Sequence, residues 1–245
     1  MKRLLISTTV AFTLVTSVNA DFIGAEIGYA AWGSSLTGDI RSGIGSLDFE
    51  KDLGYGSTEV NSFMWAYVDH PLPLIPNLKI QKTNFSDNAT GKIQNPVTFA
   101  GTSLAAVSAT TSLTLDQVDV IPYWRILDNW VNLDLGINIK AIDGNIEIKA
   151  NNTARKDFSV ILPTLYGKAR FDLPFTGLSV EADMSYIGYD GNEVSDIKAG
   201  LVYETSFGLG ATLGYRHQNM TLDDIDDTYG ELKIKGAYAG LFYHF

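Results

Sequence analysis

The 245-residue chain contains no cysteine, which excludes disulfide bridges, a thiol nucleophile and a zinc–thiolate site. Charged residues make up only 19% of the chain, below the roughly 25% that is usual in soluble domains. After the first twenty residues there is no run of 18 apolar residues, so the sequence predicts no membrane-spanning helix there. The length fits one domain of the size of a β-barrel or an α/β fold.

Positive charge is also scarce. The chain has 18 lysines and arginines against 28 acidic residues, a formal net charge of −10. Nucleic-acid affinity depends on neutralising phosphates with basic side chains, so this balance argues against a nucleic-acid partner. Aromatic residues, in contrast, are plentiful, with 12 phenylalanines, 12 tyrosines and 4 tryptophans.

The first twenty residues have the three-part layout of a secretory signal peptide. Met1-Lys2-Arg3 is basic, residues 4–18 are mainly apolar, and Val18-Asn19-Ala20 supplies small residues before a cleavage site. We therefore expect residues 1–20 to be cleaved and residues 21–245 to form the mature domain. An uncleaved N-terminal anchor is the alternative.

Apolar and polar residues alternate along most of the remaining chain. Between residues 131 and 140, odd positions hold Val, Leu or Ile, and even positions hold Asn, Asp, Gly or Lys. This period of two is typical of a β-strand with one apolar and one polar face. We expect ten strands, near residues 22–33, 58–69, 77–87, 112–124, 130–142, 157–171, 177–189, 194–204, 207–218 and 231–245. Pro163 falls inside the sixth strand, and we interpret it as a β-bulge.

The expected connections differ in length at the two ends of these strands. Those after the second, fourth, sixth and eighth strands are short, whereas those after the first, third and fifth are long and that after the ninth is intermediate. This asymmetry, with an even strand number, is typical of an outer-membrane barrel. The expected fold class is therefore all-β: a single transmembrane, antiparallel up-and-down barrel of ten strands, with eight or twelve strands as alternatives.

A soluble β-sandwich would alternate too, but two features favour a membrane barrel. Aromatic residues, among them Tyr29, Tyr67 and Tyr243, lie near the ends of apolar faces that we expect to point outward, and aromatic rings prefer the membrane–water boundary. The opposite faces carry charges such as Glu181 and Lys198. A sandwich core would exclude these charges, whereas a wet lumen accepts them.

The chain ends within a strand that has Leu241, Tyr243 and Phe245 on one face. This ending resembles the C-terminal signature of bacterial outer-membrane proteins. The resemblance implies that these three residues form a signal for the barrel-assembly machinery.

Nearly the whole mature chain resembles a family of small proteobacterial outer-membrane barrels of the OmpA, OmpW and OmpX size class, usually named only "outer membrane protein". The stretches that carry the resemblance are residues 70–77, 127–136, 165–180, 189–192 and 222–227. The resemblance implies the barrel fold and a location in the cell outer membrane. It supplies no activity.

Inward-facing charges are the candidate functional residues of such a barrel. They are Glu26, Asp119, Asp134, Lys140, Lys168, Arg170, Glu181, Asp183, Asp196, Lys198, Glu204 and Arg216. Because acids and bases are nearly balanced, they either pair across a narrow lumen and close it, or set the ion selectivity of a narrow pore. A ten-stranded lumen is smaller than that of the 16–18-stranded porins, which hold an aqueous channel.

The sequence predicts no catalytic site. Its three histidines, His70, His217 and His244, fall in different parts of the expected barrel, with no Asp-x-His or His-x-Ser pair. We therefore expect a non-enzymatic structural barrel or narrow pore. A barrel that binds a ligand or a cell through its loops, and a surface hydrolase that depends on His217, are the alternatives.

No cofactor or metal is expected. Asp223, Asp224, Asp226 and Asp227 form an acidic segment whose spacing does not follow a calcium-binding loop, so its only metal role would be weak cation bridging to lipopolysaccharide. The expected partners are outer-membrane lipid and lipopolysaccharide, the barrel-assembly machinery and periplasmic chaperones. The barrel itself is expected to be a monomer.

Overall fold

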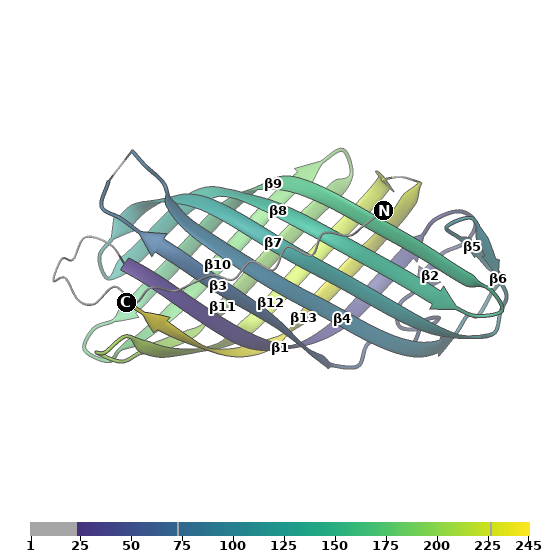
Figure 1. The fold of residues 1–245 in the computed structure, drawn as a ribbon, viewed down its shortest axis with the longest axis horizontal. Helices are drawn as coiled ribbons and strands as arrows, with labels where there is room; N and C mark the ends of the chain where they lie inside the picture. The colour runs from purple at the N-terminus through teal and green to yellow at the C-terminus, as the bar shows by residue number, and fades with distance from the viewer. Residues whose placement is uncertain (1–23, 73, 226) are drawn as a thin grey trace, which may run out of the picture.

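The computed structural model describes residues 24–245 apart from 73 and 226, so the expected signal peptide, residues 1–20, lies outside the described residues. Ten strands form a closed antiparallel barrel (Figure 1). They are β1 (Gly24–Arg41), β3 (Glu59–Asp69), β4 (Asn77–Lys92), β7 (Ser108–Asp128), β8 (Val131–Lys149), β9 (Thr153–Leu173), β10 (Leu178–Tyr189), β11 (Asn192–Glu204), β12 (Leu209–Ile225) and β13 (Thr228–His244). The predicted all-β fold and the strand number are confirmed.

Pairing between the first and last strands closes the barrel. β1 and β13 are antiparallel in register from Glu26–His244 to Arg41–Tyr229. In hydrocarbon every backbone polar group needs a partner, and closure provides one without leaving a strand edge. In the part of the chain that the structure describes, no helix is long and apolar enough to cross a membrane.

The two ends of the barrel differ. The short-turn end holds Phe245, the start of β1 and the connections 70–76, 129–130, 174–177 and 205–208 (Figure 1). The opposite end, here called the projecting end, holds β2 (Leu47–Asp48), β5 (Val97–Phe99) and β6 (Thr102–Leu104), which lie within the two long connections. β7 and β9 each have 21 residues, about twice the 9–11 that a tilted strand needs to cross a membrane.

The chemistry of the two barrel faces inverts partway along the long strands. On β8, the outward residues Leu135, Ile137 and Ile139 are each 45–47% exposed, and the polar Asp134, Asn138 and Lys140 point inward. Nearer the projecting end, Asp143, Asn145 and Glu147 point outward instead, and the buried Ile142, Ile146 and Ile148 point inward. The short-turn half therefore has an apolar belt around a polar lumen, whereas the projecting half has a polar surface around an apolar core.

The inversion corrects two expectations about the connections. The prediction of a long connection after the fifth strand, which is β8 in the structure, is wrong. β8 and β9 extend to the Lys149–Thr153 pair and leave only residues 150–152 between them. The connection after the ninth strand is also shorter than predicted, because β12 runs to Ile225 and β13 begins at Thr228. In both cases apolar and polar residues continue to alternate, but the apolar residues change from the outward to the inward positions. In the sequence, such a change resembles the end of a strand.

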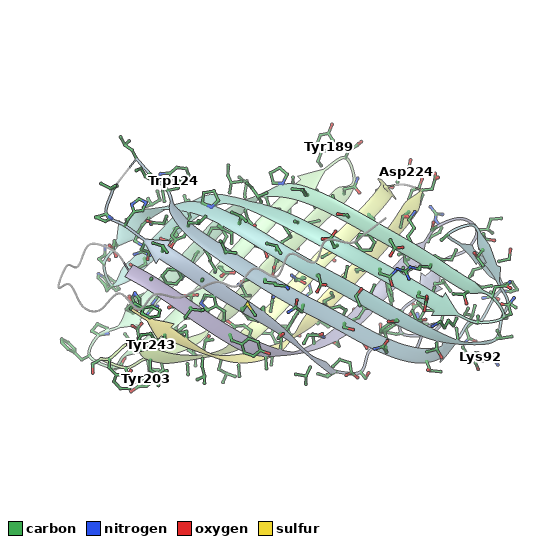
Figure 2. All side chains as sticks on the ribbon, viewed as in Figure 1. Lys92, Trp124, Tyr189, Tyr203, Asp224 and Tyr243 are labelled. Atoms are coloured by element: carbon green, nitrogen blue, oxygen red, sulfur yellow. The ribbon has the colours of Figure 1, made fainter. Side chains whose placement is uncertain are left out.

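Two single-residue expectations are also corrected. Pro163 is not at a bulge, because the β8–β9 register is unbroken from Val131–Phe171 to Lys149–Thr153. Tyr67 does not face outward: its hydroxyl donates to the Glu26 carboxylate in the lumen, 2.9 Å away. Outward aromatic side chains do line the belt, with Trp124, Tyr203 and Tyr243 toward the short-turn end in Figure 2.

The belt predicts how β8 tolerates an outward cation. Leu135→Arg places a charge against lipid and should cost roughly 2–4 kcal/mol at the membrane midplane. Asp143→Arg, on the same strand and face but beyond the belt, should cost much less. Heat-modifiable gel mobility after refolding into vesicles measures both variants, and equal losses would contradict the proposed belt.

Candidate functional site

Arg216 is the centre of a polar layer that fills the lumen at the level of the belt. Its guanidinium is fully buried and makes a two-point ion pair with Asp196, with Nη2–Oδ2 at 2.7 Å and Nε–Oδ1 at 3.0 Å. Nη1 donates to the Thr83 hydroxyl on the opposite wall at 3.0 Å. The rings of Trp32 and Phe63 each lie with their centroids 4.9 Å from the guanidinium carbon. The arginine therefore connects β12, β11, β4, β1 and β3 across the barrel.

Lys140 extends this layer toward β7. Its Nζ lies 2.7 Å from Asp119 Oδ1 and 3.4 Å from Asp196 Oδ2, and it donates to Gln117 Oε1 at 3.2 Å. Gln218 donates to the same Gln117 oxygen and to Asp196, both at 2.9 Å. Lys140 is 1% exposed, so solvent does not reach its charge.

A second group of charges lies next to this layer, toward the short-turn end. Asp183 Oδ2 accepts from Lys79 at 3.0 Å and forms an ion pair with Lys198 at 3.2 Å. Lys198 also donates to Gln81, whose amide reaches Asp119 at 3.5 Å and so joins the two groups. Buried charges are tolerated when they are paired and hydrogen-bonded in this way.

The lumen opens slightly toward the short-turn end, into a cavity of about 50 Å³. Glu26 accepts from the Trp65 indole at 2.6 Å and from the Tyr67 hydroxyl, and Lys168 pairs with Glu181 at 3.0 Å. A buried water needs roughly 10–15 Å³ of such space, so the cavity has room for a few waters. It is too small for an organic ligand of ordinary size.

All twelve charges that the sequence predicts to face the lumen do face it. Asp119 is described above, and each of the other eleven contacts another inward polar group. Glu26, Asp134, Lys140, Lys168, Arg170, Glu181, Asp183, Asp196, Lys198, Glu204 and Arg216 are divided between the central layer and the short-turn end. Sequence reasoning missed Lys79, although Lys79, Gln81 and Thr83 alternate with the apolar Leu78 and Ile80. It also missed Arg125, which pairs with Asp69 at 2.8 Å and Asp134 at 3.1 Å at the short-turn end.

The projecting half is filled by apolar side chains. Strand residues such as Leu36, Phe85 and Ile146 form one buried cluster there. The two long connections add their own apolar side chains to this cluster: Leu47, Phe49, Leu53 and Tyr55 from the first, and Ile93, Val97, Phe99 and Leu104 from the second. These connections therefore close the projecting end with an apolar plug.

Three polar groups inside the apolar core lack ordinary hydrogen bonds. Neither carboxylate oxygen of Asp87 (2% exposed), nor the Tyr55 hydroxyl, nor the Thr111 hydroxyl has a partner of normal geometry among the described residues. Burial raises the pKa of Asp87, and repulsion from Glu59 raises it further, while the nearby Asn88 backbone N–H offsets these effects in part. Burial and the Asp87 charge likewise raise the pKa of Tyr55.

The three histidines lie apart. His217 points outward from β12, between Ile197 of β11 and Lys235 of β13. His70 lies in the 70–76 connection, with its Nε2 3.1 Å from the Pro76 carbonyl oxygen. His244 Nδ1 lies 3.1 Å from Glu204 Oε1 at the short-turn end. His217 thus lies on the outer face at the level of the lumen layer, between Arg216 and Gln218 of β12, and its cross-strand neighbours are an isoleucine and a lysine.

The acidic segment occupies a tight turn rather than a loop. Asp223 and Asp224 lie just before the last residue of β12, Asp227 lies in the turn, and Asp226 lies outside the described residues. In the described ranges, no group of three or more His, Asp or Glu side chains is arranged to hold a metal ion. At the opposite end, Leu241, Tyr243 and Phe245 all face outward and are 41–65% exposed.

Comparison with known proteins supports the fold. No protein-family model matches the chain, and no curated protein matches it. Its structure is similar to that of the outer membrane protease OmpT from Escherichia coli, with a TM-score of 0.59 and 12% identity over 95% of this chain and 99% of that chain. A weaker likeness is to the translocator domain of the autotransporter NalP from Neisseria meningitidis, with a TM-score of 0.41 and 12% identity over 93% of this chain and 90% of that chain.

At this identity the likeness to OmpT shows the fold alone. The chain has the fold of an outer-membrane β-barrel. The OmpA, OmpW and OmpX size class stays a resemblance in sequence, and barrels of the OmpA and OmpX type have eight strands rather than ten.

The central ion pair predicts a large stability difference between two cation deletions. Arg216→Met leaves the Asp196 carboxylate buried without its main partner and should lower the free energy of unfolding by about 3–5 kcal/mol. Lys233→Met removes a cation from the half-exposed Lys233–Glu231 pair on the outer surface and should cost about 0–1 kcal/mol. Urea unfolding in phospholipid vesicles compares the two, and similar losses would show that the buried pair is not a main support of the barrel.

Asp87 predicts a pH dependence of stability. Because its pKa is raised in the folded protein, the folded state binds the proton more tightly, and stability decreases as the pH rises from the unfolded-state pKa through the folded-state pKa. Asp87→Asn should remove this decrease and leave the variant more stable than the wild type at pH 7. Asp116→Asn, on the outward face of β7, is the matched control and should keep the wild-type pH profile. An unchanged profile in Asp87→Asn would contradict the assignment.

Proposed function

We propose that this protein is an integral outer-membrane barrel that is non-enzymatic and does not conduct ions. The observation that carries the proposal is the polar layer around Arg216, whose charges are paired with one another and buried. An ion-selective pore needs charged groups that face a water-filled path. Arg216, Lys140 and Asp196 are 0–5% exposed, and the apolar plug of the projecting end lies in line with them.

The same features support an orientation. Outer-membrane barrels have short periplasmic turns and longer extracellular loops, and this supports a periplasmic location for the short-turn end. The projecting end then stands outside the membrane, where its polar outer face meets water. Export by a cleaved signal peptide of residues 1–20 belongs to this proposal.

Several partners follow from this orientation. The belt contacts outer-membrane lipid, and the polar outer face beyond the belt meets lipopolysaccharide. Leu241, Tyr243 and Phe245 are outward and accessible, as recognition by the barrel-assembly machinery and periplasmic chaperones requires. No cofactor is proposed, and a monomer is proposed because pairing of β1 with β13 closes the barrel within one chain.

A second candidate function is binding through the projecting end. Its support is the apolar core above the belt, because a barrel that only spans the membrane needs no such extension. Surface hydrolysis has less support: the fold likeness to a protease carries no residue role to this chain, and His217 lies between Ile197 and Lys235. Loss of turnover in His217→Ala on a lipid or peptide substrate would favour hydrolysis over both other functions.

Planar-bilayer recording tests the closed lumen. The refolded protein, shown to be folded by heat-modifiable gel mobility, should give no discrete conductance steps under conditions in which a general porin gives them. Reproducible, ion-selective steps from the folded protein would contradict the proposal and would restore the narrow pore.

A further inference from the structure

Strand pairing at the projecting end has two gaps, because two sets of strands stop early. The β3–β4 ladder ends at the Ser62–Asn84 pair, while β4 continues to Lys92. The β9–β10 ladder ends at the Leu165–Tyr186 pair, while β9 begins twelve residues earlier, at Thr153. Figure 1 shows β9 running past the β10–β11 turn toward the far end of the molecule. Above β3 and above β10, therefore, long strands lose their neighbour.

The chain itself covers the first gap. β2 pairs with β1 through Asp39–Asp48 and Ile40–Leu47, and Phe49 N–H donates to the Gly38 carbonyl at 2.9 Å. The same connection reaches the edge of β4, where Gln94 N–H donates to Asp52 Oδ1 at 2.9 Å. A Cβ at Gly91 would lie 2.4 Å from the Asp52 backbone oxygen, so the connection is in direct contact with that strand.

The second gap is covered only at its outermost end, where β6 lies beside the start of β9 and the Asn152 side chain donates to the Ser103 carbonyl at 2.9 Å. Among the described residues, no strand pairs through ladder hydrogen bonds with the β9 segment 153–164 on the β10 side, and its ladder is with β8 alone. In a sheet interior such bonds are almost always made, and an open edge is a template for another strand. Pro163 marks the inner limit of the open segment.

The backbone groups of alternate residues face this gap. Thr164 Oγ1 donates to the Asn138 carbonyl of β8, and the Asn145 side chain of β8 donates to the Lys156 carbonyl. Even-numbered residues of β9 therefore direct their backbone groups toward β8. The N–H and C=O groups of Thr153, Arg155, Asp157, Ser159 and Ile161 then point toward the gap, and Pro163, which has no N–H, has the same orientation.

The inner wall beside this edge is apolar and only half-buried. Phe158, Val160 and Leu162 of β9, Ile187 of β10 and Leu222 of β12 all pack against the core without being fully covered by it. A hollow near the tip is lined by Lys156 of β9, by Asp227 and Tyr229 at the β12–β13 turn, and by Gly43, Thr98 and Ala100 of the two long connections. A strand added to β9 would bury its own inward apolar residues against this wall.

The opposite rim of the gap is acidic. Asp190 lies in the β10–β11 turn, Asp223 and Asp224 lie near the end of β12, and Asp227 lies in the turn that follows. On β9, Arg155 is paired with Asp157 at 3.0 Å. A cationic outer face on the added strand would complement the rim. The ion pair on β9 and Pro163 are also devices by which natural edge strands avoid pairing with copies of themselves, which argues against a second copy of this chain.

We infer that the open edge of β9, residues 153–161, is a docking site for an extended cationic peptide of another molecule, alternately apolar and basic. The peptide adds a strand to β9 through the outward-directed backbone groups. Its apolar residues cover Phe158, Val160 and Leu162, and its basic residues face the acidic rim. Main-chain bonds supply affinity in this mode, and the alternate side chains supply specificity. The inference does not depend on whether the lumen conducts.

A nine-residue peptide that alternates valine and lysine tests the docking site. Fluorescence anisotropy measures its binding to the full protein in phosphatidylcholine nanodiscs, with empty nanodiscs as the blank. The labelled peptide should bind saturably. The same peptide with N-methylated backbone amides, and one with glutamate in place of lysine, should bind at least about tenfold more weakly, a loss of about 1.4 kcal/mol.

Two substitutions at one position separate strand addition from simple charge attraction. Ser159→Pro removes an N–H on the open side and leaves the bonds to β8 in place, and should weaken peptide binding about tenfold or more. Ser159→Ala keeps the N–H and should bind like the wild type. Wild-type affinity in Ser159→Pro, or equal binding of the N-methylated peptide, would overturn the inference.

Hydrogen exchange on the wild type gives a readout that no folding defect can affect. Bound peptide should slow exchange at the backbone amides of Arg155, Asp157, Ser159 and Ile161, whereas those of Lys156, Phe158 and Val160 are already bonded to β8 and should change little. Protection spread evenly over both sets, or absence of saturable binding, would contradict strand addition.

Discussion

The change of medium along the strands is the constraint on which the rest of the structure depends. Near the short-turn end the outer faces meet an apolar medium, and farther along the same strands they meet water. Since successive side chains of a strand point to opposite faces, a change outside forces the opposite change inside. β8 shows this directly, as its outward residues change from Ile139 to Asp143 and its inward residues from Lys140 to Ile142.

The barrel interior is therefore filled in two physically different ways. At the level of the belt, the inward positions are polar and are made stable by mutual pairing, with Arg216 held by Asp196, Thr83 and two aromatic rings. Above the belt, hydrophobic burial fills the interior, and the two long connections add eight buried residues to those of the strands. Asp87 is the exception, a carboxyl on the apolar side of this boundary.

Differences in strand length give the projecting end its other distinctive property. Long strands beside short ones leave ladders unpaired, and outside the membrane those backbone groups can bond to water, so an open edge is tolerated there as it would not be in lipid. The connection 42–58 closes one such edge. The edge of β9 stays available, and it lies at the end of the molecule that the proposed orientation places outside the cell.

The sequence by itself determined the fold class, the ten strands and the inward parity of charges such as Lys140, Glu181 and Arg216, because period-two alternation is local and each residue reports its own face. It did not reveal how far the strands extend, because residues 143–156 carry the same alternation with reversed parity, and a reversal in one chain looks like a loop. The side on which Tyr67 lies was also predicted wrongly. A tyrosine ring is compatible with either face of the barrel, and it is the hydrogen bond to the Glu26 carboxylate on the neighbouring strand that holds it in the lumen. The tertiary structure alone decided which charges pair, that the connections plug the core, and that β9 outruns β10. Each of these depends on contacts between residues far apart in the chain.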